Sequence, residues 1–257
     1  YNYSLGYRLQ TDTPDEEFNI DLSYSDNNMD RGENIDQTEL NLNKYYYYNE
    51  SANTNKRFKG EINYQLPLSK DYKIETGFVS SIKELTTNND YFDVINGNKT
   101  EKTLLRNHFK NDEGLYSVYA ILNGAEGDFK YQAGLRGEYA LSESELVSGG
   151  LSFTKDYFSL YPTIHLMYSL NPTDQLRLSY TRRVDRPNNH QINPFTDYSD
   201  SLNIFSGNPN LDPQYINSYE AGFSGMLGTT MLNSVFFLRH TKNQISTITT
   251  LEAGGVT

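Results

Sequence analysis

The sequence predicts an all-β fold, specifically an antiparallel transmembrane β-barrel. Three features predict it: apolar and polar side chains alternate every second residue, aromatic residues recur at a fixed spacing on the apolar face, and the connections alternate between short and long. The sequence has no run of 18 or more apolar residues, which excludes a membrane-spanning helix.

The alternation is clearest between residues 128 and 180. One face of the first strand in this stretch carries Phe129, Tyr131, Ala133, Leu135, Gly137, Tyr139 and Leu141. The residues between them are mostly polar or charged, and residues 158–170 and 176–180 repeat the pattern. Successive side chains of a strand point to opposite faces, whereas a helix needs a period of about 3.6 residues. These segments are therefore predicted to be strands with one apolar face and one wet face.

Aromatic residues mark the two ends of the apolar face. Phe129 and Tyr139 lie ten residues apart, as do Phe158 and Tyr168. Ten residues span roughly 33 Å along a strand, and a strand tilt of ~40° reduces this to a height of about 25 Å. That is the height of the apolar band between the aromatic girdles of an outer-membrane barrel. A large soluble β-sandwich, whose apolar face covers a core, is the alternative.

Ten strands are expected, at residues 1–9, 18–24, 58–66, 74–82, 115–122, 129–141, 158–170, 176–180, 215–224 and 231–240. Short turns alternate with long polar stretches, which we expect to be loops, at residues 26–55, 86–114, 141–155 and 182–213. Short turns on one rim and long loops on the other are typical of outer-membrane barrels, in which the short turns are periplasmic.

The aromatic run Tyr45–Tyr48 lies in the first of these long stretches. It can be a sugar-binding platform or part of a strand that continues beyond the membrane, and both interpretations remain open. An incomplete ring would leave strand edges unpaired in lipid, so the ten strands are expected to be part of a larger barrel.

Composition narrows the classes of function. The chain has 22 Tyr and 13 Phe, yet its mean hydropathy is -0.70, as expected when half of each strand faces water. A net charge of -11 argues against nucleic acid as a partner, because phosphate backbones need clustered Lys and Arg. The chain has no Cys, its four His are scattered, and it shows no nucleophile elbow, phosphate-binding loop or paired carboxylates. We therefore expect no enzyme, no cofactor and no metal site.

A motif rich in Arg, Pro, Asn and Gly occupies and follows the stretch at residues 182–213. Its members are Arg183, Arg186, Pro187, Asn193, Pro194, Phe195, Gly207, Asn208, Pro209, Leu211, Pro213, Tyr219 and Glu220. With residues 131–139, 161–180 and 241–243, the motif resembles the C-terminal barrel half of TonB-dependent outer-membrane receptors, especially the outer membrane protein β-barrel family of Bacteroidota. The resemblance covers most of the chain from about residue 115 onward. Gln214 departs from it, because the family usually has an acidic residue there.

Most of this motif is expected to be structural. Its four prolines lack an N–H donor and so end strand pairing, and Gly207 and Asn208 suit turns with positive φ. Arg183, Asp185 and Arg186 are expected to brace the loop through a charge network at the barrel rim, with a substrate clamp as the alternative.

The resemblance implies energised uptake of a nutrient. Loops held by a rigid scaffold concentrate binding residues, so Arg186, Phe195 and Tyr198 are the candidate ligand contacts. The implied parent protein is an integral outer-membrane barrel of about 22 strands in contact with membrane lipid, with a plug domain before residue 1 and the other strands outside this sequence. The implied partners are a TonB-type energy-transducing complex and a surface lipoprotein or other outer-membrane subunit. The alternatives are a non-transporting barrel for surface docking or assembly, and a soluble carbohydrate-binding β protein.

Overall fold

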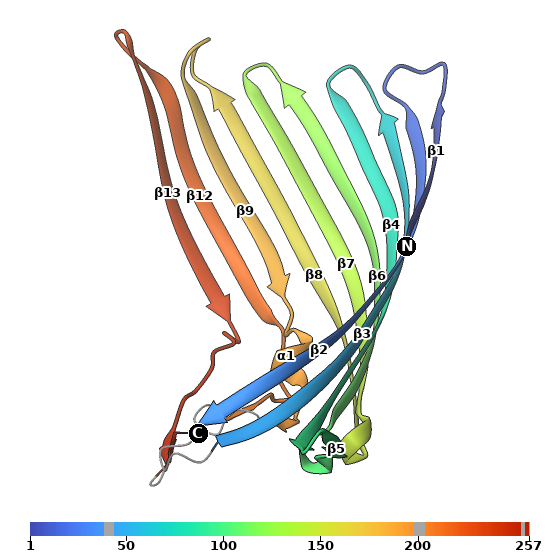
Figure 1. Ribbon diagram of the computed structural model, residues 1–257. Helices are drawn as coiled ribbons and strands as arrows, with labels where there is room; N and C mark the ends of the chain where they lie inside the picture. Colours follow the sequence, from blue (N-terminus) through green and yellow to red (C-terminus); the bar gives the residue numbers. More distant parts are fainter. Residues whose placement is uncertain (39–43, 198–203, 253–254, 257) are drawn as a thin grey trace.

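The structure, a computed structural model, describes residues 1–38, 44–197, 204–252 and 255–256. Most of them belong to one antiparallel sheet in which strands neighbouring in sequence are paired (Figure 1). In sheet order the strands are β1 (Asn2–Gln10), β2 (Glu17–Thr38), β3 (Lys44–Pro67), β4 (Tyr72–Ile95), β6 (Asn107–Glu126), β7 (Phe129–Leu146), β8 (Leu151–Ser169), β9 (Gln175–Asp185), β12 (Gln214–Leu227) and β13 (Thr230–Lys242). These strands confirm the predicted all-β antiparallel fold.

Short elements join or extend the strands. They are β5 (Asn98–Glu101), which pairs with the end of β4, the 3-10 helices η1 (Thr103–Leu105) and η2 (Val147–Gly149), the helix α1 (Asn189–Ile192), and the two-residue pairs of β10 (Thr196–Asp197) with β11 (Phe205–Ser206) and of β14 (Leu251–Glu252) with β15 (Gly255–Val256). None of the helices in the described part of the chain has the length and apolar character needed to span a membrane.

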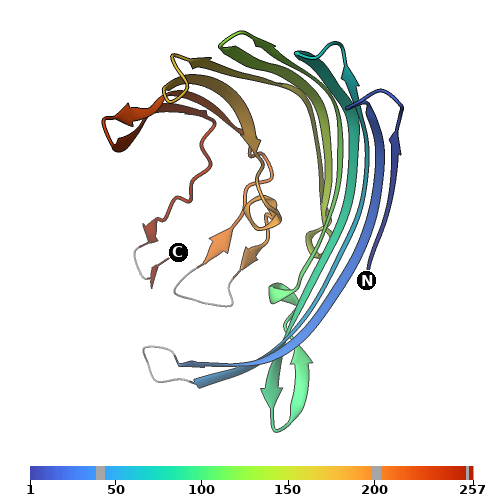
Figure 2. The ribbon, with the colours of Figure 1, turned by 90° about the horizontal axis from the view of Figure 1, so that it is seen from above.

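The sheet curves into a wide arc with a concave inner side, seen from above in Figure 2. Within the described residues, the strand order runs from β1 to β13 without closing on itself. The short connections at residues 11–16, 68–71, 127–128, 170–174 and 228–229 gather at the upper end of the view in Figure 1. The prediction that the short turns share one rim is confirmed.

Cross-strand register places aromatic residues in rows on the convex, outer face. Tyr139 pairs with Phe158, and Phe129 pairs with Tyr168. The row farther from the short turns contains Tyr3, Tyr24 and Phe58 on β1 to β3 and Tyr116, Tyr139 and Phe158 on β6 to β8. Near the short turns, the Tyr131 ring lies 6.4 Å from that of Tyr72 and 5.9 Å from that of Phe129. The pairing of strands thus builds the two expected girdles.

Apolar side chains between the two rows have little cover from the rest of the chain. Val118 is 59% exposed, Leu135 50% and Leu178 54%. Apolar surface left in water costs about 25 cal/mol per Å², so a continuous apolar band of this kind fits lipid rather than water. The inner face is polar, and there the Tyr119 hydroxyl donates to Asn63 Oδ1 at 2.7 Å.

Three of the four stretches predicted as long loops are mostly strand. β2 and β3 stay paired from Asp26↔Lys56 to Thr38↔Lys44. In the same way β4 and β6 pair as far as residues 89 and 107, and β7 and β8 as far as residues 146 and 151. The outer face of these extensions lies beyond the membrane and carries polar residues such as Asn28, Glu84 and Lys110. The loop expectation is wrong there because the apolar alternation stops while backbone pairing continues.

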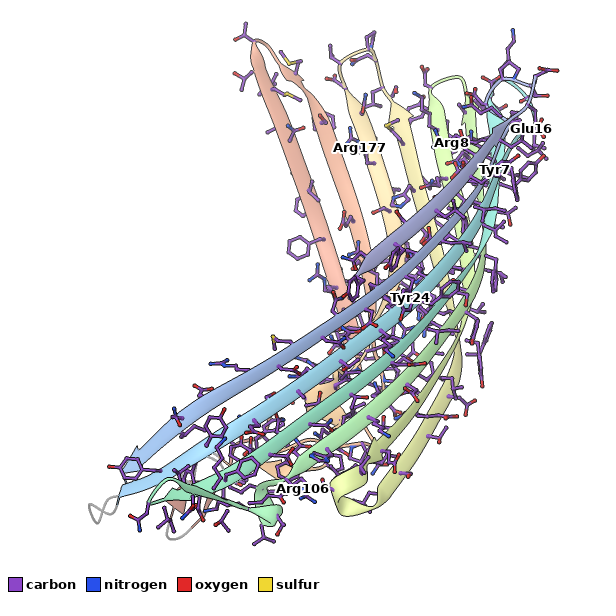
Figure 3. The ribbon with its side chains drawn as sticks, turned by 45° about the vertical axis from the view of Figure 1, so that its right-hand side comes forward. Tyr7, Arg8, Glu16, Tyr24, Arg106 and Arg177 are labelled. Carbon is purple, nitrogen blue, oxygen red and sulfur yellow. The ribbon has the colours of Figure 1, made fainter. Side chains whose placement is uncertain are left out.

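These extensions carry the sheet well beyond the outer aromatic row. In Figure 3 the strands β2 to β6 sweep away from Tyr24, and Arg106 lies near their far end. The run Tyr45–Tyr48 belongs to β3, so it is part of a strand beyond the membrane. On its outer side, Lys99 Nζ lies 3.4 Å from the Tyr48 ring centroid and 2.9 Å from Glu50 Oε1, which ties β5 to β3.

Replacing Ile164 with lysine tests the assignment of the two faces. Ile164 lies on the outer face between the aromatic rows and pairs with Ala133 and Tyr180. A charge there enters lipid at a cost of about 2–4 kcal/mol, so Ile164→Lys should impair membrane assembly. Assembly is read from heat-dependent gel mobility, and the free energy of unfolding from urea titration in lipid vesicles.

The matched control is Thr163→Lys, which places the same charge one residue away on the inner face. We expect this variant to assemble normally. Equal tolerance of the two lysines would contradict the lipid-facing assignment.

Candidate functional site

The connection from β9 to β12 lies inside the arc of the sheet (Figure 2). We call residues 186–213 the inner loop, as far as the structure describes them. β8 and β9 pair only as far as Thr163↔Thr181, whereas β9 and β12 stay paired as far as Asp185↔Gln214. We call the curved sheet the wall. The ends of β9 and β12 therefore leave the wall together and lead the chain inward.

A contact between two strands that are not paired shows this inward turn directly. Tyr215 lies on the same side of β12 as the outer-face residue Tyr219, yet its hydroxyl is 2.7 Å from Oγ of Ser159, on the inner side of β8. The Arg182 guanidinium lies 4.8 Å from the Tyr215 ring. The loop end of β12 thus stands inside the wall.

The first anchor of the inner loop is an ion pair of Arg186 with Glu138 of β7. Glu138 points inward and is 2% exposed. Its Oε1 accepts hydrogen bonds from Arg186 Nη2 and, at 3.2 Å, from the Tyr161 hydroxyl, while Arg136 lies 3.6 Å from its other oxygen. Arg186 Nε also donates to the Tyr157 hydroxyl at 2.7 Å. A carboxylate this far from water is stable only with such partners, so Glu138 holds the start of the inner loop on the wall.

The charge of Arg186 is secured by the same contacts. Burial disfavours the charged guanidinium, but the oxygens of Tyr157 and Glu138 outweigh burial and raise the pKa of Arg186 above its ordinary value. Arg186 is therefore a permanent cation at this position.

The second anchor is Asn111 of β6, whose side chain is fully buried. Its amide nitrogen donates to Oδ1 of Asn189 in α1 at 2.6 Å and to Glu113 Oε1 at 2.7 Å. Its amide oxygen accepts from the hydroxyls of Ser142 and Ser144 at 2.9 and 2.7 Å. These contacts use all four hydrogen-bonding positions of the amide, so Asn111 fixes α1 against β6 and β7.

The third anchor, Lys155 of β8, holds the far end of the inner loop. Its Nζ donates to the carbonyl oxygens of Leu211 at 2.6 Å and Asn210 at 3.2 Å, and it lies 2.7 Å from Asp212 Oδ1. An ammonium group has three N–H donors, and these contacts match them. The inner loop is thus pinned to three neighbouring strands, twice near its start, at Arg186 and Asn189, and once near its end.

Contacts within the inner loop hold its parts together. Asn188 and Gln191 form a reciprocal capping box on α1, with bonds of 3.0 and 2.9 Å. The N–H groups of Gly207 and Asn208 donate to the carbonyl oxygens of Asn193 at 2.9 Å and Gln191 at 2.7 Å. The two halves of the sequence motif are therefore joined through the main chain.

Gly207 is needed for space rather than for a left-handed turn. Neither Gly207 nor Asn208 has a positive φ, so the expectation of such a turn is wrong. A Cβ on Gly207 would lie 2.5, 2.7 and 2.8 Å from the backbone oxygens of Asn193, Gln191 and His190. Real Cβ atoms essentially never approach other atoms this closely. The backbone carbonyls around the end of α1 therefore leave room only for glycine at position 207.

The expected rim network is only partly formed by the residues named for it. Arg183 is exposed, and no ion pair joins it to another residue that the structure describes. Asp185 accepts from the Gln214 amide at 3.3 Å. A carboxylate at position 214 could not donate this bond, so the departure from the family pattern supplies it.

The other motif residues lie along the inner loop or in β12. Pro187 follows β9 and Pro213 directly precedes β12, as expected of residues that end pairing. The Tyr219 ring lies on the outer face, 4.9 Å from that of Tyr180. Glu220, the next residue, belongs to the inner face.

A cavity of about 480 Å³ separates the inner loop from the inner side of β3 to β8. Of the candidate ligand contacts, Arg186 lines this cavity. Phe195 is half-buried next to β10 and is not among the lining residues that the structure describes. Tyr198 lies outside the described residues. From the motif, Pro187, Pro209, Leu211 and Pro213 also line the cavity.

Residues 9–257 match the model of the Outer membrane protein beta-barrel family. The chain belongs to this family. The family expected from the loop motif is thereby confirmed, and the protein is an integral outer-membrane barrel in contact with lipid. This removes the soluble carbohydrate-binding alternative and the β-sandwich.

Several solved structures of outer-membrane proteins are similar in fold to this chain. The ferric citrate transporter FecA in the unliganded form has a TM-score of 0.67 and 14% identity over 95% of this chain and 34% of that chain. A double mutant of the Serratia marcescens hemophore receptor HasR, in complex with its hemophore HasA and heme, gives 0.66 and 14% over 96% and 40%. The ferripyoverdine receptor of the outer membrane of Pseudomonas aeruginosa, bound to ferripyoverdine, gives 0.65 and 15% over 95% and 33%.

Likeness at these identities shows the fold. The chain spans 33–40% of the length of the three solved chains. No curated protein matches the chain.

The sequence motif did not reveal Glu138, Asn111 or Lys155, which anchor the inner loop. Each lies on the inner side of its strand, where polar residues are ordinary. In the sequence, Glu138 is an inner-face carboxylate between Gly137 and Tyr139, and no local signal marks it as buried.

Removing the Arg186 side chain tests the first anchor. Arg186→Ala leaves the buried Glu138 carboxylate with only Arg136 and Tyr161, which should destabilise the docked inner loop by about 2–3 kcal/mol. Hydrogen–deuterium exchange of peptides from residues 186–197 and 204–213 measures the change. The control Arg183→Ala removes an exposed arginine three residues away and should leave exchange nearly unchanged. Equal exchange in both variants would show that the ion pair does not hold the loop.

A methyl group at position 207 tests the close approach inside the loop. Gly207→Ala forces the loop away from the end of α1, and we expect a loss of about 1–3 kcal/mol together with faster protease cleavage of the loop. The control is Gly222→Ala in β12, where the nearest atom lies at an ordinary 3.6 Å. A Gly207→Ala protein as resistant to protease as the control would rule out the packing role.

Proposed function

We propose that the chain is the barrel portion of a TonB-dependent receptor that takes up a nutrient across the outer membrane. The observation that carries this proposal is the inner loop, which is held inside the arc of the wall by buried polar contacts and leaves a cavity on the lumen side. A loop fixed in this way narrows the passage and presents side chains to a solute entering from outside, as a receptor for import requires.

The comparisons support the class of function. The solved structures of similar fold include the ferric citrate transporter FecA, the copper transporter OprC and the hemophore receptor HasR. They bind different ligands, so the fold does not carry the identity of the nutrient. The proposal assigns the chain no catalytic step.

The remainder of the parent protein is part of the proposal. β1 and β13 are the strands at the two ends of the sheet, and each exposes an unpaired edge within the described residues. Such edges are not viable in hydrocarbon. We propose that further strands complete a barrel of about 22, that a plug fills its lumen, and that a TonB-type complex supplies energy. A surface lipoprotein or another outer-membrane subunit is the further proposed partner, facing the extended ends of β2 to β6.

Growth of the native bacterium tests this function. We expect an in-frame deletion of the gene to abolish growth on one or a few sole nutrients in a broad panel. Inactivation of the TonB-type complex should abolish growth on the same nutrients, and a plasmid copy of the intact gene should restore the deletion strain.

The docking alternative predicts a different result. In that case the deletion strain would grow on every nutrient but lose one or more partner proteins from its surface, as measured by surface proteolysis and mass spectrometry. That outcome would overturn the transport proposal.

A further inference from the structure

We propose that the cavity between the inner loop and the wall binds a small organic anion, a carboxylate with an apolar body. The proposal deepens the function above and rests on it for the statement that the bound anion is cargo. It is carried by the charges that line the cavity, by the absence of an ion pair for Arg57 among the described residues and by apolar side chains in part of the lining.

The lining is cationic although the protein is strongly acidic overall. Of the charged residues that line the cavity, one is acidic, Glu113, and four are basic, namely Arg57, Lys83, Lys155 and Arg186. The whole chain carries a net charge of -11. This concentration of positive charge is therefore a local property of the cavity.

Two of the four cations are already neutralised by the anchors of the inner loop. Arg186 is paired with Glu138, and Lys155 is paired with Asp212. Their charges hold the loop. Of the other two cations, Lys83 lies 3.6 Å from Glu113, which leaves Arg57 as the lining cation without an ion pair among the described residues.

Arg57 and Lys83 lie directly opposite each other across β3 and β4. Like charges at directly opposite positions of an antiparallel pair destabilise the sheet. One carboxylate, Glu113, lies 3.6 Å from Lys83, and Arg57 Nε donates to the Ser81 hydroxyl at 3.2 Å. Among the described residues, no carboxylate forms an ion pair with Arg57. A bound anion would remove this repulsion and complete the coordination of the guanidinium.

The chemistry of Arg57 points to a carboxylate. A guanidinium presents two parallel N–H donors that match the two oxygens of a carboxylate, whereas Lys83 adds a point charge. The rest of the lining includes Leu115, Phe153 and Ile192, which suit an apolar body on the same molecule. A cavity of about 480 Å³ is within the size range of small-molecule sites.

Binding of a fluorinated probe to the full-length protein in detergent tests the inference. The probe is 4-(trifluoromethyl)phenylacetate, and its neutral amide is the matched compound; both are titrated by ¹⁹F NMR. We expect saturable binding of the acid and at least roughly tenfold weaker binding of the amide, because the amide lacks the charge that Arg57 recognises.

Variants locate the site. Arg57→Gln should weaken binding of the acid by roughly tenfold, whereas Arg57→Lys, which keeps the charge but loses the planar fork, should have a smaller effect. The control Lys59→Gln removes a cation from the same face of β3 that is already paired with Glu61, and it should bind like the unmodified protein. If Arg57→Gln fails to assemble, two other measurements test the inference. The unmodified protein should bind the acid more tightly than the amide, and Arg57→Lys should bind the acid more weakly than Lys59→Gln does.

Three outcomes would overturn the inference: no saturable binding of the acid at millimolar concentration, equal affinity for acid and amide, or an unchanged affinity in Arg57→Gln. These results bear on the cavity alone, because probe binding does not depend on energy transduction. A protein that binds the acid while the deletion strain grows on every nutrient would instead retain the anion site and lose the transport role.

Discussion

Backbone hydrogen bonding in a medium without water is the constraint on which this structure depends. Each N–H and C=O group inside the membrane must find a partner in the protein, and a sheet can supply these partners only through unbroken pairing from strand to strand. The register accordingly runs without a bulge from Tyr3↔Tyr24 on one edge to Ala221↔Phe236 on the other. Because successive side chains of a strand point to opposite faces, every second residue within the membrane must meet lipid.

The inner side follows a different rule, because there polar groups meet water or one another. Where water is excluded, the structure supplies partners: Glu138 accepts from Arg186 and Tyr161, and Asn111 donates two hydrogen bonds and accepts two. Such pairs are costly to break once buried. Exposed pairs on the extensions, such as Arg31 with Glu33, contribute little by comparison. The inner loop is therefore held by a few buried contacts rather than by its own length.

The rigid wall lowers the conformational entropy that is lost when the inner loop docks. Glu138, Asn111 and Lys155 are placed by strands that are already ordered, so only the loop loses conformational freedom when it docks. The docked loop in turn encloses the cavity whose other side bears Arg57 and Lys83. Lipid contact outside and the cavity inside thus depend on the same sheet.

The sequence determined the strands, their faces and the aromatic rows, because these depend on a period of two residues that is local and repeated. It did not reveal that residues 26–55 and 86–114 are mostly strand, since an extension whose outer face leaves the membrane pairs its backbone without apolar alternation. It placed the prolines and Gly207 in one loop, but not the partners of that loop. Arg186 meets Glu138 across 48 positions, Asn189 meets Asn111 across 78, and Lys155 meets Leu211 across 56. Those meetings were decided by the tertiary structure alone, because they require the register of β6 to β8 together with the inward turn of β9 and β12.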